Sequence, residues 1–136
     1  MTAHGTFTPA QWDEKTTIPI STEQKITNAS VVLHFSGDIT GVARVEWLMF
    51  YTYADPNDPH RSNAAFVGLM RFEGTLNGKA GSFVMEDHGT FQNGALHSVL
   101  TVLEDSGTGE LASITGRATY ASRGMEVAFE IEYELK

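Results

Sequence analysis

The fold is decided by residues 66–94, which read FVGLMRFEGTLNGKAGSFVMEDHGTFQNG. Two Asn-Gly pairs, Asn77-Gly78 and Asn93-Gly94, each separate runs that are rich in Phe, Val and Leu. A two-residue hairpin of type I′ requires a positive φ at both central residues, and Asn followed by Gly tolerates that conformation best. The stretch therefore predicts three antiparallel strands joined as a meander.

These two turns also set which residues face one another across the strands. The pairs that they predict are Phe72 with Phe83, Met70 with Met85, Gly68 with Asp87, and Gly89 with Ser98. One continuous face then carries an apolar set, which we expect to be buried: Phe66, Met70, Phe72, Phe83, Met85, Phe91, Leu96, Leu100 and Val102. Asp87 is the one charged residue on that face.

Length, charge and composition restrict the class of protein. The 136 residues predict one domain, residues 1–136, which is long enough to bury a core without disulfides or metals. Nine Lys and Arg against 17 Asp and Glu give a formal charge of -8, which argues against nucleic acid or an anionic membrane as a partner. Cysteine is absent, so thiolate sites are excluded. Because no apolar run has transmembrane length and no signal peptide is visible, we expect a cytoplasmic protein.

Other segments predict further strands and loops. We expect strands at residues 3–14 (interrupted at Pro9), 26–36, 39–53, 118–121 and 125–135. We expect a polar loop or an irregular edge at 15–25, a mobile loop near one mouth of the fold at 54–63, and turns around a short element at 105–117. The last strand alternates, with glutamates on one side and an apolar set on the other: Met125, Val127, Phe129, Ile131, Tyr133 and Leu135. This pattern predicts a half-buried strand whose acidic face is solvated.

Strand number and strand length together predict the fold class. Lys79–Gln92 is about 14 residues long, and a strand of that length in a small domain must coil and bend. Coiled hairpins that close on themselves leave no exposed edge. We therefore expect an all-β fold, a single closed antiparallel up-and-down β-barrel of about eight strands, lipocalin-like in its logic. Such a barrel has room inside for side chains or one small ligand.

Several motifs in a fixed order carry a family resemblance. They are Gln11–Glu14 (QWDE), SGDITGVARVEWLMFY, FVGLMRFEGTLNGKAGSFV, HGTF and SGTGELASITG. With them the chain resembles, from about Gly5 to Tyr133, a bacterial family known as domain of unknown function 3224 (DUF3224), whose fold is similar to the allene oxide cyclase barrel. The resemblance implies an antiparallel barrel with a central cavity and no established reaction. It also implies an acidic residue at the position of Met70 and a His at that of Asp87, and this chain departs at both.

Two orientations are open for residues 39–53. If Gly37-Asp38 forms the turn, His34 faces Gly41, and the aromatic face of Val45, Trp47, Met49, Tyr51 and Tyr53 is the one that we expect inside. This choice brings in Asn28, Ser30 and His34. The opposite choice brings in Arg44 and Glu46 together with Val31, Leu33 and Phe35.

Asp87 and His34 are the candidate catalytic residues. Desolvation of Asp87 in an apolar interior favours its neutral form, which suits a catalytic acid. The alternative is a carboxylate bound to a neighbouring hydroxyl or backbone amide. His34 titrates near neutrality and is a candidate general base, with a hydrogen-bonded interior or rim histidine as the alternative. We expect His34 and Tyr51 to be the partners of Asp87.

The predicted ligand-binding set is Trp47, Met49, Tyr51, Met70, Phe72, Met85, Asp87 and Ser98. Aromatic and methionine side chains supply an adaptable apolar lining, and Asp87 supplies the polar handle. No cofactor and no metal site is predicted. His88 and His97 fall near each other on the outer face, but they lack a third ligand.

Three functions remain open. The first, which we expect, is binding of a small, mostly apolar molecule inside the barrel. The second is a cyclase or isomerase of allene oxide cyclase-like type acting on an apolar substrate there, and the sequence leaves open whether any reaction is catalysed. The third is a packed barrel that acts through an oligomer or partner surface formed by the outer residues Val67, Leu69, Val84, Val99 and Leu103.

Overall fold

The chain is built from antiparallel strands. The computed structural model describes residues 1–58, 61–123 and 126–136. Across them the strands are β1 (Thr2–Pro19), β2 (Lys25–Gly37), β3 (Ile39–Tyr53), β4 (Asn63–Leu76), β5 (Lys79–Gln92), β6 (Ala95–Val102), β7 (Thr108–Gly109), β8 (Thr115–Arg123) and β9 (Glu126–Glu134). No helix in these residues is long and apolar enough to span a bilayer.

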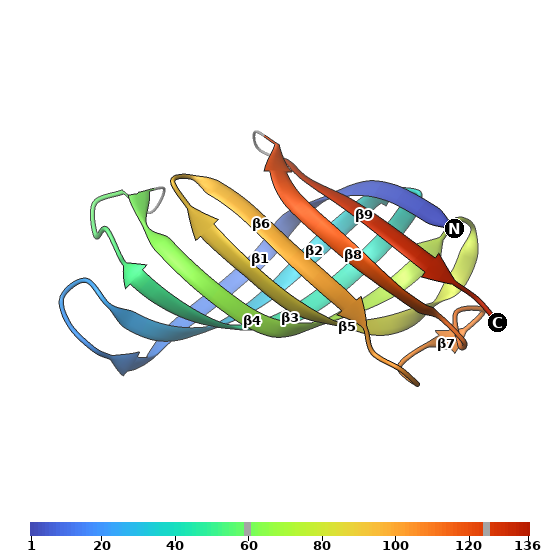
Figure 1. Cartoon of the computed structure of the whole chain (residues 1–136), viewed down its shortest axis with the longest axis horizontal. Helices are drawn as coiled ribbons and strands as arrows, with labels where there is room; N and C mark the ends of the chain where they lie inside the picture. Colours follow the sequence, from blue (N-terminus) through green and yellow to red (C-terminus); the bar gives the residue numbers. More distant parts are fainter. Residues whose placement is uncertain (59–60, 124–125) are drawn as a thin grey trace.

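Eight of the strands form a ring. Their order is β4-β3-β2-β1-β9-β8-β6-β5, and β4 also pairs with β5. The two-residue strand β7 lies outside this ring and pairs with β5 at Gly81 and Ser82. The strands run obliquely to the long axis, and both termini lie at one end of the molecule (Figure 1). The prediction of an all-β antiparallel fold with about eight strands is confirmed.

Both Asn-Gly pairs form the predicted hairpins. Asn77 and Gly78 have φ of 48° and 83°, and Asn93 and Gly94 have φ of 53° and 77°. All the registers derived from these turns are confirmed, including Phe72 opposite Phe83, Gly68 opposite Asp87, and Gly89 opposite Ser98. The predicted inner face is buried along most of its length, with Phe91 and Leu96 only half-buried where it ends.

The register of β2 against β3 differs from the prediction by one residue. Phe35, not His34, lies opposite Gly41, and Val31 lies opposite Val45. Only Asp38 lies between β2 and β3, and two backbone hydrogen bonds hold it. Its amide donates to the carbonyl of His4 (2.9 Å), and its carbonyl accepts from the amide of Asn77 (2.8 Å).

This one-residue shift exchanges the faces of β2, because side chains alternate along a strand. The aromatic face of β3 is inside as predicted, but the β2 residues beside it are Val31, Leu33 and Phe35. His34 is exposed, and Asn28 and Ser30 are half-buried on the outer side. The prediction that His34 is an interior group is therefore wrong.

Residues 15–19 continue β1, so of the two alternatives for 15–25 the structure shows the irregular edge, not the loop, in the first part. Thr16 pairs with Thr27 and Ile18 with Ile26, and Pro9 causes a bulge rather than a break. β-branched side chains on both strands favour this pairing. The β1–β2 hairpin and the β3–β4 connection consequently extend beyond the β5–β6 and β8–β9 hairpins (Figure 1). We call this the extended end.

The other predictions along the chain concern connections and the last strand. Residues 54–62 connect β3 to β4, as predicted, except that Pro59 and His60 lie outside the described residues; the mobility of this loop stays a prediction. Val127, Phe129, Ile131 and Tyr133 of β9 are buried and its glutamates are exposed, as predicted. Met125 lies outside the described residues.

The middle of the ring is filled by aromatic side chains. Phe35 is central, with ring centroids 5.0 Å from Phe7, 5.6 Å from Phe72 and 5.2 Å from Phe129. Phe72 in turn lies 5.4 Å from Phe83. Edge-to-face and tilted contacts of this kind stabilise aromatic cores beyond simple burial.

Candidate functional site

Asp87 on β5 lies at the centre of a buried hydrogen-bond network. Its side chain has no solvent exposure. Oδ2 accepts hydrogen bonds from Trp47 Nε1 (2.9 Å) and from the Tyr120 hydroxyl (2.7 Å), and Oδ1 accepts one from the Ser98 hydroxyl. The four residues come from β3, β5, β6 and β8, so this single carboxylate joins half of the ring.

The register brings these four side chains together. Trp47 lies opposite Gly68, which lies opposite Asp87, and the indole of Trp47 reaches Asp87 across the glycine. A Cβ at Gly68 would lie 2.8 Å from Trp47 Cδ1. On the other side of β5, Tyr120 of β8 lies opposite Ser98 of β6. Ser98 is two residues along β6 from Leu100, the residue that lies opposite Asp87. The space beside Gly68 is therefore occupied by Trp47.

Burial governs the acid–base behaviour of this network. Desolvation raises the pKa of Asp87, while hydrogen bonds from Ser98, Trp47 and Tyr120 and the charge of His88 act in the opposite direction. Burial also raises the pKa of Tyr120 well above its usual value, and the negative charge of Asp87 adds to this effect. The Tyr120 hydroxyl therefore keeps its proton and donates a hydrogen bond to the carboxylate of Asp87.

The predicted site residues all lie on the inner side of the ring except His34. Met70, Phe72, Met85 and Ser98 are fully buried, and Trp47 and Met49 nearly so. Their role in ligand binding stays a prediction. Asp87 does not contact the two predicted partners, since its donors are Trp47, Ser98 and Tyr120, and Tyr51 bonds elsewhere. Tyr120 was missed because the strand predicted at 118–121 is too short to show an alternation.

A second carboxylate network lies towards the extended end and was not predicted. Glu14 on β1 accepts a hydrogen bond from Trp12 Nε1 at Oε1 (3.0 Å). Its Oε2 accepts from the hydroxyls of Thr27 (2.7 Å) and Tyr51 (2.6 Å). Burial, followed by the hydrogen bond and the charge of Glu14, raises the pKa of Tyr51. The sequence hides this network because residues 15–25 are polar and contain Pro19, a pattern typical of a loop or an irregular edge, so that Glu14 falls at the end of the predicted strand.

The two networks are joined by a pair of tryptophans. The rings of Trp12 and Trp47 lie 5.6 Å apart between centroids. Each indole donates to a different carboxylate, Trp12 to Glu14 and Trp47 to Asp87. Trp47 is buried, whereas half of Trp12 is exposed. Trp12 is therefore the solvent-facing member of an aromatic pair that leads to the interior.

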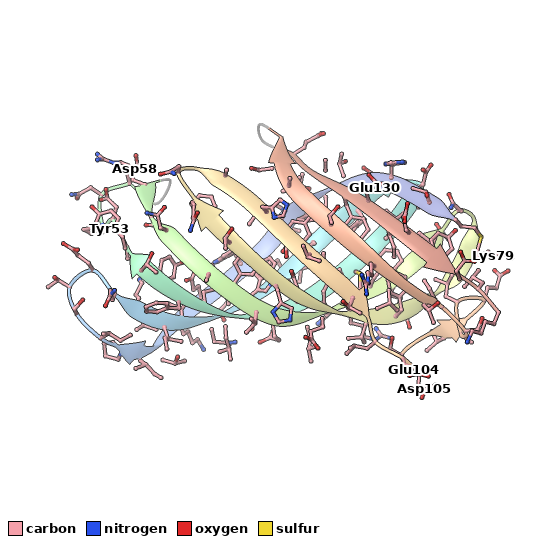
Figure 2. The ribbon with its side chains drawn as sticks, viewed as in Figure 1. Tyr53, Asp58, Lys79, Glu104, Asp105 and Glu130 are labelled. Atoms are coloured by element: carbon pink, nitrogen blue, oxygen red, sulfur yellow. The ribbon has the colours of Figure 1, made fainter. Side chains whose placement is uncertain are left out.

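A hollow of about 470 Å³ adjoins the Glu14 network at the extended end. Glu14, Thr27 and Tyr51 line it from the strands, and Lys25, Asp55 and Ser62 are among the residues that line it from the strand ends and the connection. Lys25 Nζ lies 5.2 Å from the centroid of the Tyr51 ring. Figure 2 shows Tyr53 and Asp58 at this end and Lys79 at the opposite one. We call this cavity the end hollow.

Three further surface features offer fewer groups that could bind a ligand or catalyse a reaction. A hollow of about 360 Å³ is lined by His4, His97 and Glu130 among others. His88 Nε2 lies 2.7 Å from Glu86 Oε1 on the outer face, and no group of three His, Asp or Glu side chains suited to a metal occurs among the described residues. Of the predicted outer patch, Val67, Leu69 and Val99 are exposed, and Val84 and Leu103 are half-buried.

Taken together, the ring and its two networks define an all-β protein in which eight antiparallel strands surround a packed aromatic interior with two carboxylates. The chain belongs to the DUF3224 family of proteins of unknown function, whose family model matches residues 3–133. This confirms the family resemblance of the sequence.

A solved structure of a protein with unknown function from the DUF3224 family of Shewanella oneidensis MR-1 is similar to this chain. Its TM-score is 0.75 at 19% sequence identity, and the match covers 100% of this chain and 98% of that one. At this identity the likeness shows the fold alone. A comparison with curated proteins gives no match.

Proposed function

We propose that the chain is a binding protein for a small, mostly apolar molecule that enters the ring at the extended end. The apolar body of the ligand lies against Trp12 and Tyr51 and continues towards Trp47 and Met49. Glu14 provides the polar contact. The tilted pair of Trp12 and Trp47, joined through the hydrogen bond from Trp12 to Glu14 with a residue that lines the end hollow, is the observation that carries this proposal.

Three features of this end support binding there. The end hollow has a volume within the range of sites for small molecules. Trp12 exposes half of a large aromatic side chain, which binding of an apolar molecule would cover. Glu14 accepts three hydrogen bonds, and a carboxylate can accept about four, so one acceptor position is open to a ligand.

Asp87 has a different place in this proposal from the one that the sequence predicted. Its oxygens also accept three bonds, but the residue has no exposure, and its donors hold four strands. A ligand would have to displace Trp47 to reach it. We therefore assign the first polar contact with the ligand to Glu14. Asp87 is the group whose hydrogen bonds hold β3, β5, β6 and β8 together inside the ring.

The finer description of the fold belongs to the same proposal. We infer that the ring is a closed up-and-down barrel, allene oxide cyclase-like in shape and lipocalin-like in use, located in the cytoplasm. The continuous cycle of strand pairs supports the first part of this inference. A cyclase or isomerase reaction is a second candidate function, because Asp87 and Tyr120 form a buried acid–phenol pair.

Fluorescence titration tests the binding proposal directly, since the chain has only two tryptophans and the proposal puts the ligand against both. The probe is N-phenyl-1-naphthylamine, a neutral apolar fluorophore that accepts energy from tryptophan. We expect saturable energy transfer, weakened about tenfold or more in Trp12→Ala and unchanged in the outer-face control Leu48→Ala. Absence of saturation, or equal loss in both variants, would overturn the proposal.

A further inference from the structure

Among the described residues, the long strand edge of the ring that lacks a neighbour belongs to β1. β9 pairs with β1 only from Thr2 to Phe7, whereas β2 pairs with it from Gly5 to Pro19. From Thr8 onward, β1 therefore has a strand on one side only, within the described part of the chain. Figure 1 shows the β1–β2 hairpin diverging from β8 and β9, in keeping with the lack of a β9 partner for this part of β1.

The middle of this edge lacks the proline and the bulge that often protect a strand edge from pairing. Pro9 and Pro19 stand at its two limits, and the register against β2 shifts between Pro9 and Gln11 and between Thr16 and Ile18. Within residues 10–18, the part between these shifts, residues 11–16, has no proline and no bulge. In this segment only Glu14 is partly buried, and Trp12 and Ile18 are about half exposed. An unpaired edge of this length is a template for addition of another strand.

The charge pattern of the segment selects the partner. Asp13, Glu14 and Lys15 are consecutive. If two copies of this edge pair antiparallel about a twofold axis at Glu14, Asp13 of one copy lies opposite Lys15 of the other, and the symmetry repeats this pair. Opposite charges in directly opposed positions stabilise antiparallel strands. A self-complementary edge of this kind is a property of isologous twofold contacts.

The two Glu14 residues, which would meet on the axis, do not oppose this arrangement. Glu14 is held by Thr27 on β2 and Tyr51 on β3, so its carboxylate is directed away from the free edge of β1. On the same face, Trp12 of one copy comes opposite Thr16 of the other. The added strand covers the exposed part of the indole, and burial of that apolar surface favours association.

We propose that two copies of this chain associate through the free edge of β1, residues 10–18, to form a continuous antiparallel sheet across a twofold axis at Glu14. The partner strand then lies beside the proposed ligand entrance, because Trp12 and Glu14 belong to the same segment. Association of two copies through this edge does not depend on ligand binding. The dimer requires only the free edge, its length and its charges.

Charge reversal tests the pairing by sedimentation velocity over a concentration series. We expect a reversible dimer in the wild type. Asp13→Lys and Lys15→Asp should each weaken it by about tenfold, because two attractive pairs become repulsive, and the double variant Asp13→Lys/Lys15→Asp should restore it to within about threefold. These residues are exposed, so the variants should fold, which circular dichroism checks.

Leu69→Lys is the matched control, since it places a charge in the exposed apolar patch on the outer face of β4. It should leave the dimer unchanged. Hydrogen exchange provides a second readout: backbone amides within residues 10–18 should gain protection as protein concentration rises. A wild type that is monomeric at every concentration overturns the proposal. A dimer that Leu69→Lys disrupts and Asp13→Lys does not also overturns it, and would place the contact on the outer face.

Discussion

Asp87 shows how a buried carboxylate can be tolerated when its surroundings supply donors. Trp47, Ser98 and Tyr120 each donate to it, and no buried polar side-chain atom in the described residues lacks a partner. Removal of such an acceptor leaves several donors unsatisfied, which is more destabilising than the loss of one average hydrogen bond. The consequences of substitution therefore depend on what replaces the carboxylate.

Asp87→Ala should destabilise the protein by about 3 to 5 kcal/mol, because three buried donors lose their acceptor. Asp87→Asn should change stability by only about 1 kcal/mol or less. The amide oxygen can accept from Trp47 and Tyr120, and the amide nitrogen can donate to Ser98, whose single hydroxyl hydrogen can then turn from position 87 to the carbonyl of His88, 2.8 Å from its oxygen. Urea denaturation measures both changes. Equal loss in the two variants would contradict this account of the network.

The pH dependence of stability, compared between the wild type and Asp87→Asn, isolates the titration of Asp87. Burial raises the pKa of Asp87 in the folded state above its ordinary value of about 4. The folded state then binds more protons than the unfolded state between those two pKa values, so this residue lowers stability as pH rises through that window. Asp87→Asn cannot titrate. The free energy of unfolding of Asp87→Asn should therefore increase relative to that of the wild type as pH rises from about 4 towards neutrality. A difference that is constant with pH, or that shrinks as pH rises, would mean that the pKa is not raised.

Glu14 is the residue on which the proposed polar contact depends. Tyr51→Phe removes one donor to Glu14 and frees a second acceptor position, whereas Glu14→Gln removes the charge. We expect Glu14→Gln to weaken uptake of a small apolar amine more than uptake of a neutral apolar molecule of the same size, since only the amine gains from a carboxylate. Competition against N-phenyl-1-naphthylamine measures both. Equal effects on both ligands would remove Glu14 from the site.

At the scale of elements, close approach of strands depends on single glycines. Gly68 on β4 has no side chain where Glu46 and Trp47 of β3 pass, and a Cβ there would lie 2.1 Å from the carbonyl oxygen of Glu46. A backbone atom cannot give way as a flexible side chain can. Gly78 differs, because its surroundings are open and only its φ of 83° disfavours other residues.

Gly68→Ala should therefore lower stability by about 2 to 4 kcal/mol and disturb the hydrogen bond between Trp47 and Asp87, while Gly78→Ala should lower it by only about 1 kcal/mol. The wavelength of tryptophan emission provides a second measurement, since only the first variant should shift it. If Gly78→Ala proves the more harmful, the contact between β3 and β4 is looser than the structure indicates.

These elements also show what the sequence could and could not predict. The hairpins at Asn77-Gly78 and Asn93-Gly94 followed from local turn chemistry, and their registers placed Asp87 opposite Gly68 correctly. The β2–β3 corner depends on hydrogen bonds to His4 and Asn77, residues distant in sequence, so its register was off by one. The donors to Asp87 come from strands that are likewise distant in sequence, and Glu14 lies in a hairpin without a recognisable turn. Local patterns specify hairpins, whereas contacts across the ring complete the site.

At the scale of the whole molecule, the two ends of the ring differ. Both termini lie at one end, whereas the other, extended end has the end hollow, the exposed half of Trp12 and the open edge of β1. Ligand entry and association of two copies are thus proposed at the same end. Covering of Trp12 by a partner strand should then change affinity for the ligand, and titration above and below the dimerisation concentration measures this link.

The central claim is that a small apolar molecule binds beside Trp12 and Trp47, and their two indole N–H resonances in a nitrogen–proton NMR spectrum test it most directly. These are the only tryptophans in the chain, so each signal reports on one side of the site. On addition of N-phenyl-1-naphthylamine, we predict a large, saturable shift of the Trp12 signal and a smaller one of Trp47. The amides of Gly78 and Lys79 at the opposite end should stay unchanged. Saturable shifts at Gly78 and Lys79 with both indole signals unmoved would contradict the claim.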